Sequence, residues 1–271
     1  STRQSTLFPY TTLFRSTALY LARQAVQGGD ADCVLALGFE QMEKGALGSK
    51  WTDRTNPMDK HVEVMNRTQG FNQAPPTAQM FGGAGREYRW KYGTRRETFA
   101  KIASKARTHA SRNPLALFNQ PLSVEEVMAS EEVFDPLTRL QCCPPTCGAA
   151  AAVIASEDFV RRKGISGAVR ILAQQMSTDY GSAFGDSMIG MIGYDMAKGC
   201  AQALYQKAGI GPQDVQVVEL HDCFTTNELL TYEAIGLCPE GGAEQFIWDG
   251  QNTYGGKYVT NPSGGLLSKG H

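Results

Sequence analysis

A histidine and a cysteine stand two residues apart, directly after a run of apolar residues. The run is VQVVEL, residues 215–220, and His221-Asp222-Cys223-Phe224 follows it. Residues 225–228 read TTNE, a T-x-x-E capping box before apolar residues at helical spacing. The pattern predicts a buried strand, a turn and a helix. His221 and Cys223 then lie in the turn, at the end of a strand where open α/β sheets bind their ligands.

Acid–base and thiol chemistry are open to this pair. In an extended turn, residues two apart point the same way, so we expect both side chains to face one cavity. The start of a helix favours negative charge, and we expect it to lower the pKa of the Cys223 thiol. The alternative is that Cys223 packs as a small apolar side chain and a backbone group satisfies His221. The local pattern leaves both interpretations open.

A glycine-rich segment near the end of the chain is the second candidate. Residues 261–265 read NPSGG and lead through Leu266 to Gly270 and His271. Paired glycines let backbone N–H groups approach a ligand closely. Taken alone, however, an ordinary glycine-rich turn explains the segment better.

The elements expected to position these residues alternate between helix and strand. We predict a helix at Thr17–Gln27, ended by Gly28-Gly29, and a buried, parallel-type strand at Cys33–Leu37. Residues 45–128 are polar and proline-punctuated, typical of an inserted, largely helical subdomain. A second α/β section follows, which is also compatible with a doubly wound fold. Its predicted elements are strands at Ala149–Ala155 and Ala168–Ala173 and a helix at Met196–Lys207.

Composition excludes several classes of protein. The 26 Lys+Arg against 27 Asp+Glu argue against a dedicated nucleic-acid binder, which would show a basic surplus. The 42% hydrophobic and 20% charged content is typical of a globular chain, and no apolar run is long enough to span a bilayer. An odd number of cysteines, seven, without framework spacing indicates thiols in a reducing compartment.

The first residues do not fit this pattern. Residues 6–16, TLFPYTTLFRS, look like the in-frame translation of a DNA sequencing adapter, and coherent patterning begins at Thr17. A native polar-aromatic arm is the alternative. We expect residues 1–16 to be non-native and leave them out of the fold.

Taken together, the two candidate segments resemble a known family. HDCF after a buried strand, with NPSGG and GH downstream, is similar to the C-terminal half of 3-ketoacyl-CoA thiolases of the sterol-carrier-protein type (propanoyl-CoA C-acyltransferases), in which HDCF is a distinctive marker. The resemblance covers residues 17–271. The further segments that carry it are STALYLARQ, CVLALGFEQM, EVMASEEVF, LQCCP, NELLTYEAIGLCPEG and NTYGGK.

The resemblance implies an α/β thiolase fold, with two related halves in αβαβα layers and a mostly helical inserted loop domain, here truncated at both ends. It implies a remnant of the N-terminal half at 17–46, a CoA-binding loop domain at 47–130, the end of the N-terminal half at 131–157 and the C-terminal half at 158–271.

The resemblance also implies residue roles. His221 binds the thioester oxygen of the second substrate, and Cys223 moves the proton at the α-carbon. His271 activates the nucleophile and contributes to the oxyanion site. A loop shapes the substrate pocket, and its residues are Asn261, Ser263, Gly264 and Gly265.

Three departures from the family pattern stand out. The nucleophilic cysteine of the family belongs just before STALYLARQ, where the adapter-like residues stand, so we expect the chain as given to be inactive. The chain stops at His271, inside the G-H-P motif and without a peroxisomal tripeptide. Cys147 stands where the family usually has aspartate.

The implied function is acyl-CoA C-acyltransfer, the thiolytic cleavage of 3-ketoacyl-CoA with branched or sterol-derived chains, in peroxisomal lipid metabolism. The alternative is a non-catalytic acyl-CoA- or lipid-binding or lipid-transfer protein, cytoplasmic if not peroxisomal. Neither requires a cofactor, since CoA thioesters are substrates. The full-length protein is expected to be a homodimer, with lipids as further ligands and no nucleic-acid partner.

Other site types have little support. A zinc site lacks C-x-x-C or H-x-x-x-H spacing, so we expect no metal; its candidate ligands are His221, Cys223, Cys238 and His271. Gly82-Gly83-Ala84-Gly85 follows no strand and is a poor dinucleotide motif. The basic stretch Arg86–Arg112 is either a solvated helix face or a surface that attracts CoA phosphates.

Overall fold

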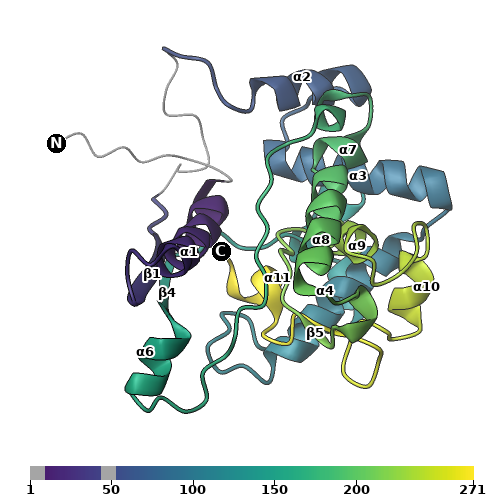
Figure 1. Ribbon diagram of the computed structural model, residues 1–271. Helices are drawn as coiled ribbons and strands as arrows, with labels where there is room; N and C mark the ends of the chain where they lie inside the picture. The colour runs from purple at the N-terminus through teal and green to yellow at the C-terminus, as the bar shows by residue number, and fades with distance from the viewer. Residues whose placement is uncertain (1–9, 44–52) are drawn as a thin grey trace. The chain divides into compact units, whose positions relative to one another are not determined.

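The computed structural model describes residues 10–43 and 53–271, which form helices joined to short strands (Figure 1). The chain divides into two compact units. The first contains the described residues up to Thr55, together with Pro145–Met176 and His271. The second contains Asn56–Pro144 and Ser177–Gly270. The predicted division into two halves and an inserted domain stays a prediction.

The first unit is a two-stranded sheet with a helix along it. Strands β1 (Cys33–Glu40) and β4 (Gly148–Ala155) pair antiparallel, with Cys33 opposite Ala155. Helix α1 (Tyr10–Gly28) packs against this sheet, and α6 (Glu157–Arg162) follows β4. These elements confirm the helix predicted from Thr17 and both strands, although α1 begins upstream, at Tyr10.

Two predictions for this unit are wrong. The strand at Cys33–Leu37 is not parallel, because its partner β4 runs antiparallel to it. It is not buried either, because α1 packs against the two-stranded sheet but leaves many of its apolar side chains exposed. Leu35 is 61% exposed, Phe39 72% and Val153 68%. The second error is residues 168–173, which form no strand. Val169 is 91% and Leu172 59% exposed, so this run is not packed as a buried strand would be.

The second unit is mainly helical. Its described part confirms the helical character predicted for residues 45–128 and the helix predicted at Met196–Lys207. The helices are α2 (Asp59–Thr68), α3 (Pro76–Tyr92), α4 (Arg96–Ala110), α5 (Val124–Met128), α7 (Met188–Met191), α8 (Tyr194–Ala208), α9 (Thr225–Ala234), α10 (Ala243–Trp248) and α11 (Gly265–Lys269). Its strands are β2 (Glu132–Phe134), β3 (Leu137–Thr138), β5 (Val217–Val218) and β6 (Val259–Thr260), and its 3₁₀ turns are η1 (Arg139–Gln141), η2 (Gly181–Phe184) and η3 (Pro212–Asp214).

Local sequence explains several of these boundaries. Helix α3 has proline at its first position, where the missing N–H costs nothing. Ser123 and Glu126 form a complete capping box at the start of α5. Helices α3 and α8 both end at glycines with positive φ, Gly93 and Gly209, as left-handed C-caps require.

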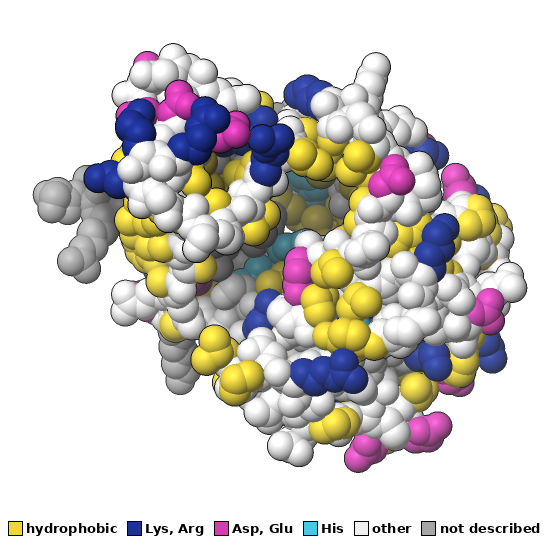
Figure 2. All heavy atoms as spheres, turned by 60° about the horizontal axis from the view of Figure 1, so that its bottom comes forward, with side chains coloured by type: hydrophobic (Ala, Val, Ile, Leu, Met, Phe, Trp, Pro, Cys, Tyr) yellow, Lys and Arg dark blue, Asp and Glu magenta, His cyan; other side chains and the backbone are white. Residues whose placement is uncertain are grey.

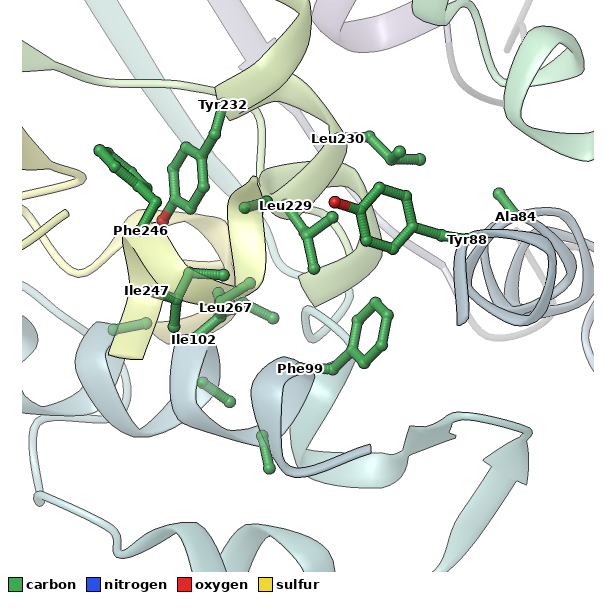
Figure 3. Packing of buried hydrophobic residues seen from close by; sticks show 14 of the residues in the cluster. Ala84, Tyr88, Phe99, Ile102, Leu229, Leu230, Tyr232, Phe246, Ile247 and Leu267 are labelled. Carbon is green, nitrogen blue, oxygen red and sulfur yellow. The ribbon is translucent and has the colours of Figure 1, made fainter. Parts of the chain in front are cut away.

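A core of large side chains holds α3, α4 and α9 together (Figure 3). Tyr88 from α3, Phe99 and Ile102 from α4, and Leu229 and Tyr232 from α9 are all 0% exposed. Burial of each such side chain contributes about 1.5–3 kcal/mol. The core therefore fixes α9, whose first residue directly follows the candidate turn.

A buried ion pair crosses the same core. Lys105 of α4 binds Glu228 of α9, and their side chains are 6% and 0% exposed. Lys105 Nζ also donates to Thr260 Oγ1 of β6 at 2.7 Å. Tyr232 donates its hydroxyl to the same Glu228 carboxylate. Removing one partner of such a pair costs about 3–5 kcal/mol, because the other charge stays buried.

Candidate active site

The predicted turn lies between β5 and α9. Strand β5 pairs parallel with β6, and its two residues are shorter than the predicted 215–220; Val217 is 57% exposed, so the prediction of a buried strand is wrong. His221 is half-buried, and its carbonyl accepts a 2.5 Å hydrogen bond from Asn227 Nδ2. Cys223 is 5% exposed. The structure thus places His221 and Cys223 on one turn, as predicted.

A second segment lies alongside this turn. Cys142 and Phe224 form an isolated antiparallel bridge, and the Cys143 N–H donates to the Cys223 carbonyl at 2.9 Å. The Phe224 ring stacks on Phe81 with centroids 4.8 Å apart. These contacts hold the turn from outside its own strand and helix.

The predicted T-x-x-E capping box does not form. The N-cap of α9 is Phe224, which makes no side-chain cap. Thr225 instead donates its hydroxyl to Gln141 Oε1 at 3.0 Å. The glutamate expected to complete the box, Glu228, points into the core and binds Lys105. A buried charge partner therefore outweighs the local cap.

The prediction of a lowered Cys223 pKa is also wrong. Burial raises the pKa of the Cys223 thiol well above its ordinary value, and the neighbouring Cys143 and Asp222 raise it further. Desolvation of the thiolate thus outweighs any stabilisation from the start of α9. Cys223 is a protonated thiol at neutral pH.

The glycine-rich segment is tied closely to the same turn. Asn261 is fully buried with φ of 48°, and its Oδ1 accepts the Leu220 N–H at 2.8 Å. His109 Nδ1 donates to the Asn261 carbonyl at 3.1 Å. Ser263 donates its hydroxyl to Glu219 at 2.8 Å. The Asn261 and Ser263 side chains thus brace the loop, and their role in substrate binding stays a prediction.

Asp222, between the two predicted catalytic residues, makes a contact that sequence reasoning missed. Its fully buried carboxylate accepts the Leu266 N–H at 2.6 Å. A side chain on Gly265 would place its Cβ 1.9 Å from Asp222 Oδ2, so only glycine allows this approach. Burial, and then the charge of Glu228, raise the pKa of Asp222 to about 7. Asp222 therefore fastens the start of α11 to the turn.

The third predicted catalytic residue belongs to the other compact unit. His271 is half-buried, and its carbonyl accepts a hydrogen bond from Thr146 Oγ1 at 3.0 Å. Within the second unit, the structure therefore brings together His221, Cys223 and the loop 261–265.

Most bases in Arg86–Arg112 already have partners. Ion pairs to carboxylates occupy Arg89, Lys91, Arg95, Arg96 and Lys105. On the face shown in Figure 2, Lys and Arg side chains are interspersed with Asp and Glu.

Four bases of this stretch lie over aromatic rings and form no ion pair within residues 53–271; one of them, Arg86, lies over Phe134 and donates to Gln69 Oε1. Arg107 lies over Phe118 and Arg112 over Tyr254. Lys101 shares the Trp248 ring with Arg95, 4.5 and 4.4 Å from its centroid. These four bases are the ones that no carboxylate of residues 53–271 neutralises.

The part of the chain that the structure describes holds neither a candidate metal cluster nor a candidate membrane span. No group of three or more His, Cys, Asp or Glu residues that could hold a metal ion occurs among the described residues. No helix in that part of the chain is long and apolar enough to cross a membrane.

Comparison with known proteins identifies the family. The model for the thiolase N-terminal domain matches residues 15–158, and the model described as thiolase C-terminal domain-like matches residues 186–271. The chain belongs to the thiolase family. The predicted fold class and family are thereby confirmed.

Relatives in both sequence and structure agree with this assignment. Sterol carrier protein 2 of Homo sapiens is 58% identical over 94% of this chain, which spans about half, 47%, of that relative. Benzoylsuccinyl-CoA thiolase subunit BbsB of Thauera aromatica is 42% identical over 94% of this chain and 63% of its own length. An Ltp2–ChsH2(DUF35) aldolase structure shares the fold, with a TM-score of 0.75 at 24% identity over 95% of this chain and 65% of the other.

Proposed function

We propose that the protein is an acyl-CoA C-acyltransferase of the propanoyl-CoA type, which cleaves 3-ketoacyl-CoA with branched or sterol-derived chains in peroxisomes. The observation that carries this proposal is the turn that holds His221 beside a buried, protonated Cys223. The similarity to sterol carrier protein 2 and to a benzoylsuccinyl-CoA thiolase subunit supports the substrate class.

The protonation of Cys223 suits the cleavage direction. Thiolysis begins when a thiolate attacks the ketone carbon of the substrate. The bond to the α-carbon then breaks, and its electron pair stays on the α-carbon as the enolate of the shortened CoA thioester. Cys223 donates its proton to that carbon. Its raised pKa means that the thiolate left behind readily takes up another proton.

His221 and the loop 261–265 act on the substrate around that step. His221 donates a hydrogen bond to the thioester oxygen, where the enolate charge collects. The loop shapes the pocket, and His271 activates the nucleophile. Asp222 joins the loop to the turn, because it accepts the Leu266 N–H at the start of α11, directly after the loop.

The nucleophile itself is not among the seven cysteines. We infer this for Cys142, Cys143, Cys223 and Cys238, because burial raises the pKa of each thiol and so opposes a thiolate. The remaining three cysteines fall outside the position that the family nucleophile occupies. The 271 residues alone are therefore expected to bind acyl-CoA without turning it over.

A second function is a non-catalytic carrier of acyl-CoA or lipid, which the name sterol carrier protein 2 among the relatives favours. Binding without turnover by the 271 residues does not separate the two. The full-length protein does, because only the enzyme becomes acylated at a cysteine by acetyl-CoA.

The test compares variants of the full-length protein in the cleavage of acetoacetyl-CoA. Cys223→Ala should abolish carbon–carbon cleavage but leave acylation of the nucleophile detectable by mass spectrometry. His221→Ala should slow cleavage by about 10²–10³-fold, as for loss of one oxyanion donor. Cys238→Ala, which removes a partly buried thiol outside the turn, should keep the rate. Near-normal turnover by Cys223→Ala would move the acid–base role elsewhere.

A further inference from the structure

Two cysteines face each other across the short antiparallel pairing beside the turn. The bridge joins Cys142 to Phe224, so one step along the same pairing Cys143 lies opposite Cys223. The hydrogen bond from the Cys143 N–H to the Cys223 carbonyl, at 2.9 Å, fits this register. Side chains directly opposite in an antiparallel pair lie on the same face. The thiols of Cys143 and Cys223 therefore project to one side.

The spacing of such a pair suits a disulfide. Hydrogen-bonded antiparallel partners have Cα atoms about 5.5 Å apart, and disulfides span Cα distances of about 4.4–6.8 Å. Cys142 is excluded, because successive residues of an extended segment alternate faces. Its thiol lies 3.5 Å from the Thr138 carbonyl instead.

The two thiols differ in solvent exposure. Cys223 is 5% exposed, and Cys143 is half-buried, so a small oxidant reaches Cys143 first. Both lie in one small apolar cluster with Phe134, Leu137 and Phe224. Burial, with the nearby Asp222 and Cys142, raises the pKa of Cys143 to about 12. Only a small fraction of either thiol is a thiolate at neutral pH, so oxidation of the pair is slow at that pH.

We propose that Cys143 and Cys223 are a redox modification site, which a hydroperoxide converts into a reversible disulfide. The Cys143 thiolate attacks the peroxide O–O bond and takes one oxygen as a sulfenic acid, while the remaining alkoxide or hydroxide leaves with a proton. The Cys223 thiolate then attacks that sulfur, and hydroxide leaves as water. Two thiols lose two protons and two electrons, and the peroxide becomes an alcohol, or water, plus water.

The consequence rests on the proposed function. In the disulfide, Cys223 carries no proton to donate to the α-carbon, so the oxidised enzyme loses carbon–carbon cleavage until a dithiol restores the pair. Acylation of the nucleophile does not need Cys223 and continues. Oxidation therefore blocks one half of the reaction.

The experiment treats the 271-residue chain with hydrogen peroxide at mildly alkaline pH, alkylates the remaining thiols and maps disulfides by tandem mass spectrometry without reduction. We expect one new link, Cys143 to Cys223, which dithiothreitol removes. It should persist in Cys142→Ser and disappear in Cys143→Ser and Cys223→Ser.

Fragment spectra of the unsubstituted chain distinguish Cys142 from Cys143 even where a variant fails to fold. A disulfide through Cys142 would overturn the proposal. So would alkylation of both Cys143 and Cys223 after a peroxide treatment that is strong enough to oxidise solvent-exposed thiols. If the link forms but oxidised full-length enzyme keeps its cleavage rate, the disulfide stands and the acid–base role of Cys223 falls.

Discussion

The contact between Asp222 and Gly265 makes a sharp prediction about Gly265→Ala. Gly265 has φ of 62°, and an added Cβ would lie 1.9 Å from Asp222 Oδ2. The new methyl group and the carboxylate cannot both keep their places. The carboxylate must move away and release the Leu266 N–H that it now binds at 2.6 Å.

The expected loss has two parts. A non-glycine residue in the left-handed region costs about 1–2 kcal/mol. Loss of a hydrogen bond to a charged group costs about 1.5–3 kcal/mol more. We therefore expect Gly265→Ala to lower the free energy of unfolding by about 3–5 kcal/mol. Gly209→Ala is the matched control, since Gly209 has φ of 68° and nothing within 4 Å of its added Cβ. It should lose only the backbone part.

Urea unfolding followed by circular dichroism measures both losses, and amide exchange at Leu266 shows whether its hydrogen bond is released. In an Asp222→Ala background, where no carboxylate is left to displace, Gly265→Ala should cost only what Gly209→Ala costs. The reasoning fails if the two glycine changes are equally destabilising in the unsubstituted chain, or if the Leu266 amide stays protected in Gly265→Ala.

Two further predictions concern charge. Because the pKa of Asp222 is raised to about 7 in the folded chain, the folded state holds a proton that the unfolded state releases, so the free energy of unfolding should fall as pH rises from about 4 to about 7 and then level off. Asp222→Asn should flatten this slope in pH-dependent urea titrations. An unchanged slope would assign the pH dependence to other groups. The second prediction concerns CoA binding measured by calorimetry: the double variant Lys101→Gln, Arg112→Gln should weaken the affinity by about three- to tenfold and reduce its salt dependence. The control variant Lys91→Gln, Arg95→Gln removes bases already paired with carboxylates and should leave the affinity unchanged. Equal effects of the two double variants would favour a solvated helix face.

Sequence patterns predicted the fold best where a local rule decides the structure. The apolar runs at residues 33–37 and 149–155 are strands, and the helical spacing at 196–207 is a helix, because propensity and periodicity act over neighbouring residues. The run at 168–173 is also mostly apolar, apart from Arg170, but it has no partner strand in the described residues. Whether an apolar run pairs depends on what lies beside it, which its own residues do not state.

The candidate site divides in the same way. The turn that carries His221 and Cys223 follows from residues 215–228 alone. The direction of the Cys223 pKa shift does not, because it depends on burial and on Cys143, which approaches from a distant segment. Local spacing assigns Glu228 to a helix cap for the same reason, since its actual partner, Lys105, belongs to another helix. The contact between Asp222 and Gly265 has a trace in the sequence, namely an acidic residue inside HDCF and a pair of glycines downstream.

The fluorescence of the Trp248 indole is an intrinsic probe of the charges around it. Arg95 and Lys101 both lie over its ring, and its Nε1–H donates to Thr98 Oγ1 at 3.0 Å. Emission from an indole depends on the electric field across its ring, and two cations lie directly against this ring. A polyanionic ligand that drew Lys101 away would change the colour and intensity of the emission without any dye. Trp90, by contrast, is 87% exposed and emits from a water-like environment.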